Sequence, residues 1–312
     1  MKFLTGRHFK FGPRDLFPGL LAALLLSPLV SARAALYVGQ EDAHRVGTYD
    51  SSTGATSNAN FITGLGVNKG LLLSGNTLFV SDNSSGKVST YNAATGAVIS
   101  ANFITGLTGP RDLALSGNTL FVAHTGPNTV GAYDATTGAV IAANLIGGLS
   151  NPVGLALFGN NIFVSDPTLG GVFEYDKTTG KSAGFGSITL GSPTSLALAG
   201  TSLYIVLAGS SSVGKYDAPT GTAINASFIT GLSSPAGLAL SGNDLYVANQ
   251  SINTVGDYNA TTGTAINASL VFTGSSTNPS SLAVTQVPEP GSLALAALGA
   301  LMLLSRDARR RA

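Results

Sequence analysis

A short apolar triplet returns along the chain at an almost constant spacing. Successive triplets are 42, 42, 42, 41 and 42 residues apart, and a tyrosine and then a Thr-Gly pair follow each one in register. The triplets are Leu36-Tyr37-Val38, Leu78-Phe79-Val80, Leu120-Phe121-Val122, Ile162-Phe163-Val164, Leu203-Tyr204-Ile205 and Leu245-Tyr246-Val247. A fixed period of this length indicates one structural unit repeated six times.

Each unit predicts four short strands. The triplet and the segment that ends at the tyrosine are rich in β-favouring residues, and the Thr-Gly pair suits a tight hairpin turn. A segment such as "NFITGL" follows, and then an apolar run such as "DLALSGN" at 112–118, which lacks polar alternation, as in a strand covered on both faces. A four-stranded antiparallel unit of about 42 residues is typical of a β-propeller blade, and a solenoid is the rival repeat fold.

The two ends of the repeated region predict how the ring closes. The first unit begins at the triplet strand with Leu36, and the last repeated element is the apolar run at 281–284. The first unit therefore lacks the strand that the end of the chain supplies. We expect residues 281–284 to pair with residues 36–38, which completes six antiparallel blades and removes the exposed edges. The predicted fold class is all-β, a six-bladed β-propeller.

Two short motifs of the repeat resemble those of known propellers. A Pro-x-Gly-Leu-Ala-Leu pattern followed by Leu-Tyr-Val-Ala, as at 235–240 and 245–248, is similar to the NHL-like and YVTN-like repeats. The resemblance covers residues 36 to 284 and implies the fold. The motifs are degenerate, so they do not identify a function.

The first 34 residues read as a secretory signal peptide. Basic residues precede an apolar run from Leu16 to Val30, and Ala32-Arg33-Ala34 offers small residues for signal peptidase, with a cut expected after Ala34. An uncleaved anchor is the alternative. In both cases the chain is exported.

The last 26 residues have three parts in a fixed order. Val287-Pro288-Glu289-Pro290 is followed by an uncharged stretch, Gly291 to Ser305, and then by a cluster of arginines, Arg306, Arg309, Arg310 and Arg311. The apolar stretch predicts a short transmembrane helix of about 22 Å, less than the ~30 Å hydrocarbon core, with the arginines holding the end in the cytoplasm. A generic C-terminal anchor is the alternative reading.

This tail resembles the PEP-CTERM sorting signal. The resemblance implies a bacterial envelope protein whose tail is recognised at the Pro-Glu-Pro residues and removed by the membrane protease exosortase. We therefore expect domains at 1–34 (signal peptide), 35–286 (propeller) and 287–312 (sorting signal). The protein is expected in the envelope or outside the cell, anchored in the membrane only until it is processed.

Composition excludes several classes of function. Between the two processed ends, residues 35–287 hold seven Lys or Arg and twelve Asp or Glu, so this body is mildly acidic and its cations are dispersed. Nucleic-acid binding is not expected of such a surface. There is no cysteine, which excludes thiol nucleophiles and thiolate metal sites.

A ring of residues, five of them polar, stands two places after each triplet. Its members are Gln40, Asp82, His124, Asp166, Leu207 and Asn249. Propellers bring these positions to one rim, where carboxylates, an imidazole and amides suit a hard cation or a sugar. Asp and Asn at such positions also cap turns through the backbone, and this alternative stays open.

Two cations interrupt the small and apolar residues at the entry to the apolar strands. Lys69 and Arg111, the latter followed by Asp112, lie on adjacent units together with Asp82 and His124. These residues predict a weakly defined ligand site of Lys69, Asp82, Arg111, His124, Asp166 and Asn249, suited to an acidic glycan or another carboxylate. Drift on a solvated loop is the alternative explanation.

A catalytic interpretation depends on a metal. Gluconolactonase-like six-bladed propellers resemble this chain in fold, and they hold a divalent metal with Glu, Asn and Asp ligands in the channel. The corresponding alternative here is Ca²⁺ or Zn²⁺ on Glu41, Asp82, Asp166 and Asn249. The other glutamate of the body, Glu174, precedes a strand tyrosine and is expected away from the axis.

The sequence favours a binding or structural protein without a cofactor, and it leaves the enzyme question open. By resemblance, the exported propeller is linked to exopolysaccharide or biofilm, with exosortase and signal peptidase as processing partners and a polysaccharide or an envelope protein as a possible ligand. A metal-dependent lactonase or hydrolase is the first alternative. A protein-interaction scaffold is the second.

Overall fold

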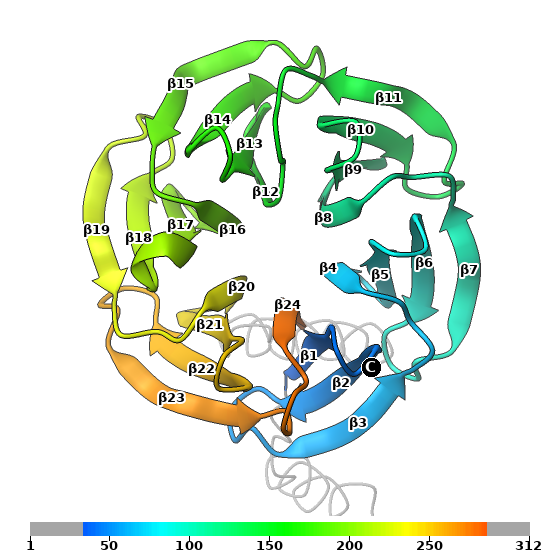
Figure 1. Cartoon of the computed structure of the whole chain (residues 1–312), viewed down its shortest axis with the longest axis vertical. Coiled ribbons are helices and arrows are strands. Elements are labelled where there is room, and N and C mark those ends of the chain that lie inside the picture. The colour runs from blue at the N-terminus through cyan, green and yellow to red at the C-terminus, as the bar shows by residue number, and fades with distance from the viewer. Residues whose placement is uncertain (1–33, 286–312) are drawn as a thin grey trace, which may run out of the picture. The chain divides into compact units, whose positions relative to one another are not determined.

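Six four-stranded sheets follow one another around a common centre in the computed structural model, which describes residues 34–285 (Figure 1). Every pairing within a sheet is antiparallel. The predicted six-bladed β-propeller is therefore confirmed. Almost all of the expected signal peptide and the whole expected sorting tail, including its transmembrane helix, lie outside the described residues. Within 34–285, no helix has the length and apolarity needed to cross a membrane.

Each blade contains four strands, which lie side by side in order from the centre of the ring to its outside. The innermost strands are β24 (Pro279–Val284), β4 (Asn68–Ser74), β8 (Pro110–Ser116), β12 (Leu155–Phe158), β16 (Pro193–Ala199) and β20 (Pro235–Ser241). The second strands are β1 (Ala35–Gln40), β5 (Thr77–Asp82), β9 (Thr119–His124), β13 (Asn161–Asp166), β17 (Ser202–Leu207) and β21 (Asp244–Asn249).

The outer half of each blade is built from the tyrosine strand and the Phe-Ile strand. The third strands are β2 (Arg45–Asp50), β6 (Lys87–Asn92), β10 (Thr129–Asp134), β14 (Gly171–Asp176), β18 (Ser212–Asp217) and β22 (Thr254–Asn259). The outermost strands are β3 (Thr56–Ile62), β7 (Val98–Ile104), β11 (Val140–Ile146), β15 (Ser182–Thr189), β19 (Ala223–Ile229) and β23 (Ala265–Phe272), and a 3-10 turn, η1 (Ala208–Ser210), follows β17. We number the blades I to VI, starting with β24-β1-β2-β3.

The core lies between neighbouring blades. Each hydrophobic cluster combines the triplet strand of one blade with residues of the next blade, so each sheet stabilises its neighbours. In the cluster between blades I and II, Tyr37 and Val46 pack with Leu78 and Val80, and all four side chains are buried. Burial of a large apolar side chain contributes about 1.5–3 kcal/mol, so the triplets account for much of the stability of the ring.

The hairpin turn between the third and outermost strands uses the Thr-Gly pair as expected. Gly138 takes a φ of 75°, a left-handed conformation that an L side chain rarely adopts. The carboxylate of Asp134 caps this turn by accepting hydrogen bonds from the backbone N–H groups of Thr136 and Thr137 at 2.9 and 2.8 Å. The same contacts recur in blades I, II, IV and VI, so this turn has the same local structure in five of the six repeats.

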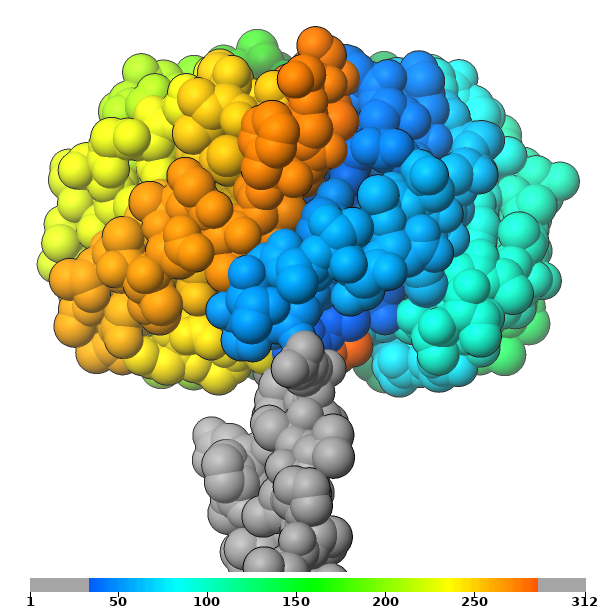
Figure 2. Space-filling view, turned by 90° about the horizontal axis from the view of Figure 1, so that it is seen from below, coloured from blue at the N-terminus to red at the C-terminus, as the bar shows by residue number. Residues whose placement is uncertain are grey.

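Blade I is assembled from both ends of the described chain. Leu36, Tyr37 and Val38 pair with Val284, Ala283 and Leu282, which is the register that the sequence predicts. Figure 2 shows the segments from the two ends of the described region side by side, in blue and orange. The N–H of Ala35 also donates to Thr285 Oγ1 at 2.7 Å. Ring closure through the terminal strand is confirmed.

Ala34 belongs to the folded body. Its side chain is buried in the cluster between blades VI and I, and its carbonyl oxygen accepts a hydrogen bond from the N–H of Ser51 at 3.0 Å. A cut after Ala34 removes these contacts. The position of the cut, expected after Ala34, stays a prediction of the sequence.

Removal of residues 279–285 should open the ring. Without β24, the edge of β1 is exposed and the apolar face formed by Leu36 and Val38 loses Leu282. We expect a chain of residues 34–278 to aggregate or to lose cooperative thermal unfolding, whereas a chain of residues 34–285 unfolds in one transition. Differential scanning calorimetry of the two chains checks this. A single sharp transition at the same temperature in both would contradict it.

Candidate functional site

A cavity of about 380 Å³ lies where the innermost strands surround the axis. Its wall includes residues that start the innermost strands and residues of the loops between second and third strands. The polar and charged lining residues are Glu41, Lys69, Arg111, Asp112, Thr194, Ser195, Ser234, Gln250, Ser280 and Ser281. The volume is that of a small-molecule site, and the hydroxyl, amide and charged groups suit a polar ligand.

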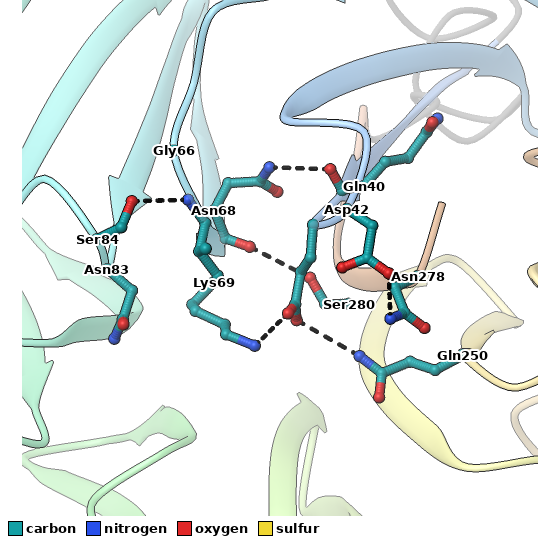
Figure 3. Close-up of polar contacts among 12 residues, drawn as sticks. Gln40, Asp42, Gly66, Asn68, Lys69, Asn83, Ser84, Gln250, Asn278 and Ser280 are labelled. Carbon is teal, nitrogen blue, oxygen red and sulfur yellow. Dashed lines mark hydrogen bonds and ion pairs between the residues drawn. The ribbon is translucent and has the colours of Figure 1, made fainter. Parts of the chain in front are cut away.

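An ion pair links two blades at the wall of this cavity. Lys69 Nζ contacts a carboxylate oxygen of Glu41, and both side chains are mostly buried, with 21% and 12% exposed. The amide of Gln250 donates to the other Glu41 oxygen at 3.4 Å (Figure 3). Glu41 thus connects β4 of blade II with the loop after β21 of blade VI, and its carboxylate is already paired.

Arg111 and Asp112 lie next to this pair, on β8. Burial lowers the pKa of Arg111, and the nearby charge of Glu41 opposes the change. Burial raises the pKa of Asp112 to about 6, although its carboxylate accepts hydrogen bonds from the N–H groups of Leu155 and Leu113, both at 2.9 Å. At neutral pH the two cations and two anions of the wall balance, and protonation of Asp112 gives the cavity a net positive charge.

Several buried polar atoms around the cavity lack a partner. Among residues 34–285, Arg111 Nε, Thr194 Oγ1 and Ser281 Oγ are buried without a hydrogen bond, and all three residues line the cavity. Asn68 Oδ1, on β4 beside Lys69, is a fourth such atom. An unpaired buried donor or acceptor costs about 1–3 kcal/mol, so these four atoms mark a polar region that the strands themselves do not satisfy.

Irregular pairing explains why Lys69 and Arg111 reach the cavity. Both residues lie inside the innermost strands, near their first residues, and not on the preceding solvated loop. The register between β4 and β5 shifts between Asn68 and Gly70, and that between β8 and β9 shifts between Pro110 and Leu113. A bulge re-aims side chains at the strand end, and here it falls at the position of each cation.

The two aspartates of the predicted ring use their carboxylates to accept hydrogen bonds from backbone N–H groups of nearby turns and loops. Asp82 accepts hydrogen bonds from the N–H groups of Gly66, Ser84 and Ser85, and a Cβ at Gly66 would meet its carboxylate at 2.4 Å. Burial alone would raise the pKa of Asp82, but these hydrogen bonds lower it. Asp166 accepts four backbone N–H groups in the same manner, from Ser150, Asn151, Thr168 and Leu169.

The other members of the predicted ring are also buried in local contacts. Asn249 Oδ1 accepts from the N–H of Ser233 at 3.2 Å, and Gln40 donates to the hydroxyl of Tyr49 at 2.9 Å. His124 is 4% exposed and lies 3.4 Å from Tyr133 Oη, and burial lowers its pKa to about 4. Leu207 is buried too.

The structure therefore divides the predicted site residues. Lys69 and Arg111 line the cavity together, but Asp82, His124, Asp166 and Asn249 do not. These four end the second strands, one strand away from the axis, where turn amides and neighbouring hydroxyl groups occupy their polar atoms. Of the alternative metal set, Glu41 lines the cavity and the other three do not, and no group of three or more His, Asp or Glu residues within 34–285 is arranged to hold a metal.

Sequence reasoning missed the polar contribution of Gln250 and of the hydroxyls of Thr194 and Ser281. Gln250 stands one place after the ring position, where Glu41 stands in blade I. If the six repeats had been compared at the residue three places after each triplet, rather than two, Glu41 and Gln250 would have stood at equivalent positions.

Comparison with known proteins gives a sorting signal and a fold. Residues 286–311 match the PEP-CTERM protein-sorting motif. The chain carries an exosortase sorting signal. This PEP-CTERM motif implies export, sorting to the cell envelope and processing by exosortase, as the tail predicts. No curated protein matches the chain.

The body has separate similarities. Residues 72–183, about a third of the chain, match the model of the outer membrane protein assembly factor BamB. The crystal structure of a nidogen/laminin complex contains a chain with a TM-score of 0.68 and 16% identity, covering 80% of this chain and 98% of that one. A computationally designed protein, Ika8, has a TM-score of 0.49 and 17% identity, with 78% and 73% covered. The nidogen/laminin likeness shows the propeller fold alone.

The buried imidazole of His124 should reduce stability in mild acid. Its pKa is about 4 in the folded chain and 6.5 when exposed, so below pH ~6.5 the unfolded chain binds the proton first and stability falls as pH falls. The loss reaches about 2–3 kcal/mol near pH ~4.5. We expect His124→Gln, which copies Gln40 of blade I, to remove this loss. Urea unfolding of both proteins at pH 7 and 4.5 measures it, and equal losses in both would contradict it.

Proposed function

We propose that this exosortase-sorted propeller is a binding protein of the cell envelope or matrix, and that its axial cavity binds an acidic saccharide of an exopolysaccharide. The observation that supports this best is the unpartnered, buried Nε of Arg111 at the cavity wall, beside the Glu41–Lys69 ion pair. A guanidinium binds a carboxylate through charge-assisted hydrogen bonds, which are among the stronger polar interactions.

The remaining wall suits the rest of a sugar. Hydroxyl groups of Thr194, Ser195, Ser234 and Ser280 line the same cavity, and together with Gln250 they offer donors and acceptors to sugar hydroxyls. The two cations give one part of the wall affinity for a negative group, while Glu41 and Asp112 limit the net charge. A non-enzymatic role agrees with the pairing of Glu41, whose carboxylate is held by Lys69 and Gln250.

Arg111→Ala should weaken binding of an acidic glycan. With a polyuronate oligosaccharide as the probe, we expect a loss of roughly tenfold or more, because a hydrogen bond to a charged group contributes about 1.5–3 kcal/mol. Isothermal titration of the purified protein measures the dissociation constant. Lys181→Ala is the matched control. It removes an exposed cation immediately before β15, and it should bind the probe as the wild type does.

A second readout tests whether the cavity is the site. Since the pKa of Asp112 is about 6, binding of the acidic probe should strengthen as pH falls from 7 to 5, and Asp112→Asn should abolish this dependence. Binding that is unchanged in Arg111→Ala would remove the cavity from the proposal. Absence of binding to acidic and neutral polysaccharides alike would contradict the proposal as a whole.

A protein-contact role is the second candidate, and one observation favours it. The outermost strands of adjacent blades II and III expose apolar pairs at their first residues, Val98 with Ile99 and Val140 with Ile141, each 57–62% exposed. Exposed apolar side chains that recur on neighbouring blades offer a surface for a protein. Failure of the glycan experiment would favour this candidate.

A further inference from the structure

Two carboxylates share one face of the blade VI sheet, at its seam with blade I. Asp244 begins β21, and Asp257 of β22 pairs in register with Tyr246, two residues after Asp244. Residues two apart on a strand point to the same face of the sheet. That face packs against blade I, because the Tyr246 hydroxyl donates to the carbonyl oxygen of Ser51 at 3.2 Å.

Within the described part of the chain, one oxygen of the buried Asp257 carboxylate has no hydrogen-bond partner. Asp257 is 4% exposed, and the unpaired atom is Oδ1. Burial, and then the charge of Asp244, raise the pKa of Asp257 to about 7, although the N–H of Tyr258 bonds to its carboxylate. Burial also raises the pKa of Asp244, although the Tyr246 side chain bonds to it. Buried polar atoms are normally satisfied, so a carboxylate oxygen left open beside a second carboxyl group indicates a place for positive charge.

Blade IV shows how the same position is satisfied without a cation. Glu174 stands at the position of Asp257, and it accepts hydrogen bonds from Asn161 Nδ2 at 2.6 Å and from the N–H of Phe185 at 2.9 Å. Asn161 stands at the position of Asp244. Blade VI therefore has a second carboxylate where blade IV has an amide donor, and among the described residues Asp257 lacks the hydrogen bond that Glu174 receives.

Blade V places a cation at this point of its own seam. Lys215 occupies the position of the buried aspartate, and its ammonium donates to the carbonyl oxygen of Ala260 at 3.1 Å over two aromatic rings. The Tyr204 hydroxyl donates to the same carbonyl at 2.6 Å, as that of Tyr246 does to Ser51. In the seam between blades V and VI, a cation therefore lies beside the carbonyl of Ala260. In the seam between blades VI and I, two carboxylates lie on the face of the sheet that meets the equivalent carbonyl of Ser51.

We propose that a calcium ion binds in the seam between blades VI and I, ligated by the carboxylates of Asp244 and Asp257 and by the carbonyl oxygen of Ser51. Calcium accepts six to eight oxygen ligands in flexible geometry, so water completes the shell. Asp244 is partly exposed and gives the ion a route from solvent. Asp244 follows the turn between first and second strands, so the site lies at the opposite end of the strands from the axial cavity mouth and does not depend on the proposed function.

Calcium titration of the purified protein tests this site. We expect about one calcium ion per chain, with a dissociation constant at or below about 1 mM, as in extracellular calcium modules. Saturating calcium should raise the melting temperature by roughly 5 °C or more, because it binds the folded chain alone. Asp257→Asn and Asp244→Asn should each weaken calcium binding roughly tenfold or more and remove the rise in melting temperature.

The controls separate this site from other acidic groups. Asp176→Asn makes the same change of charge at a turn position where other blades have Asn92 or Asn259, and it should bind calcium as the wild type does. Glu41→Gln should also retain calcium binding, and loss of binding in that variant would place the ion in the cavity and overturn the proposal. Asp244→Asn puts an amide beside Asp257, in the arrangement that Asn161 and Glu174 have in blade IV. We therefore expect this variant to fold even if Asp257→Asn fails to fold.

Absence of calcium binding up to about 10 mM, well above the range of extracellular modules, would overturn the proposal. Equal calcium affinity in the wild type and both seam variants would overturn it as well. Stabilisation by acid with no effect of calcium would mean that the two carboxyl groups share a proton instead.

Discussion

Antiparallel pairing of β24 with β1 brings the last repeated strand against the first and turns a row of six units into a ring. This pairing completes blade I by adding its innermost strand, and it places Ser280 and Ser281 in the wall of the axial cavity. It also brings blade VI against blade I, where Tyr246 contacts Ser51. An open row of blades would have neither the axial cavity nor this seam, so both proposed sites depend on a contact between residues more than 240 positions apart.

Six near-identical units give this protein a uniform frame, and the differences between units create its chemistry. The turn and core positions are repeated with little change, because a hairpin and a packed triplet tolerate few residue types. At two other positions the blades diverge. The entry to the innermost strand holds Lys69 in one blade and Arg111 in the next, and the residue before the strand tyrosine is Glu174, Lys215 or Asp257 in successive blades.

The period and the two ends of the repeated region were enough to predict the blades, their number and the register of closure. One unit repeats in register, and the first copy lacks the strand that the last repeated element supplies. The site was harder to predict. Asp82 and Asp166 have the right residue type for a metal, but their oxygens accept turn amides, a competition that spacing does not resolve. Lys69 and Arg111 line the cavity, and the bulges that orient them leave no signal in the sequence, so their role as ligand-binding residues stays a prediction. Asp257 was missed because the sequence shows only a charged residue in a strand. Its burial and its unpaired oxygen are visible only in the structure.

The PEP-CTERM motif sends the chain to the envelope, and the ring supplies a stable body with a polar axial cavity. Hydrogen–deuterium exchange followed by mass spectrometry tests ring closure most directly. The account predicts that peptides from β1 and β24 exchange as slowly as those from β5 and β6 of blade II, and that all are released in one cooperative unfolding event. Fast exchange of the β24 peptide, while the central strands of the other blades stay protected, would show an open ring and contradict the account.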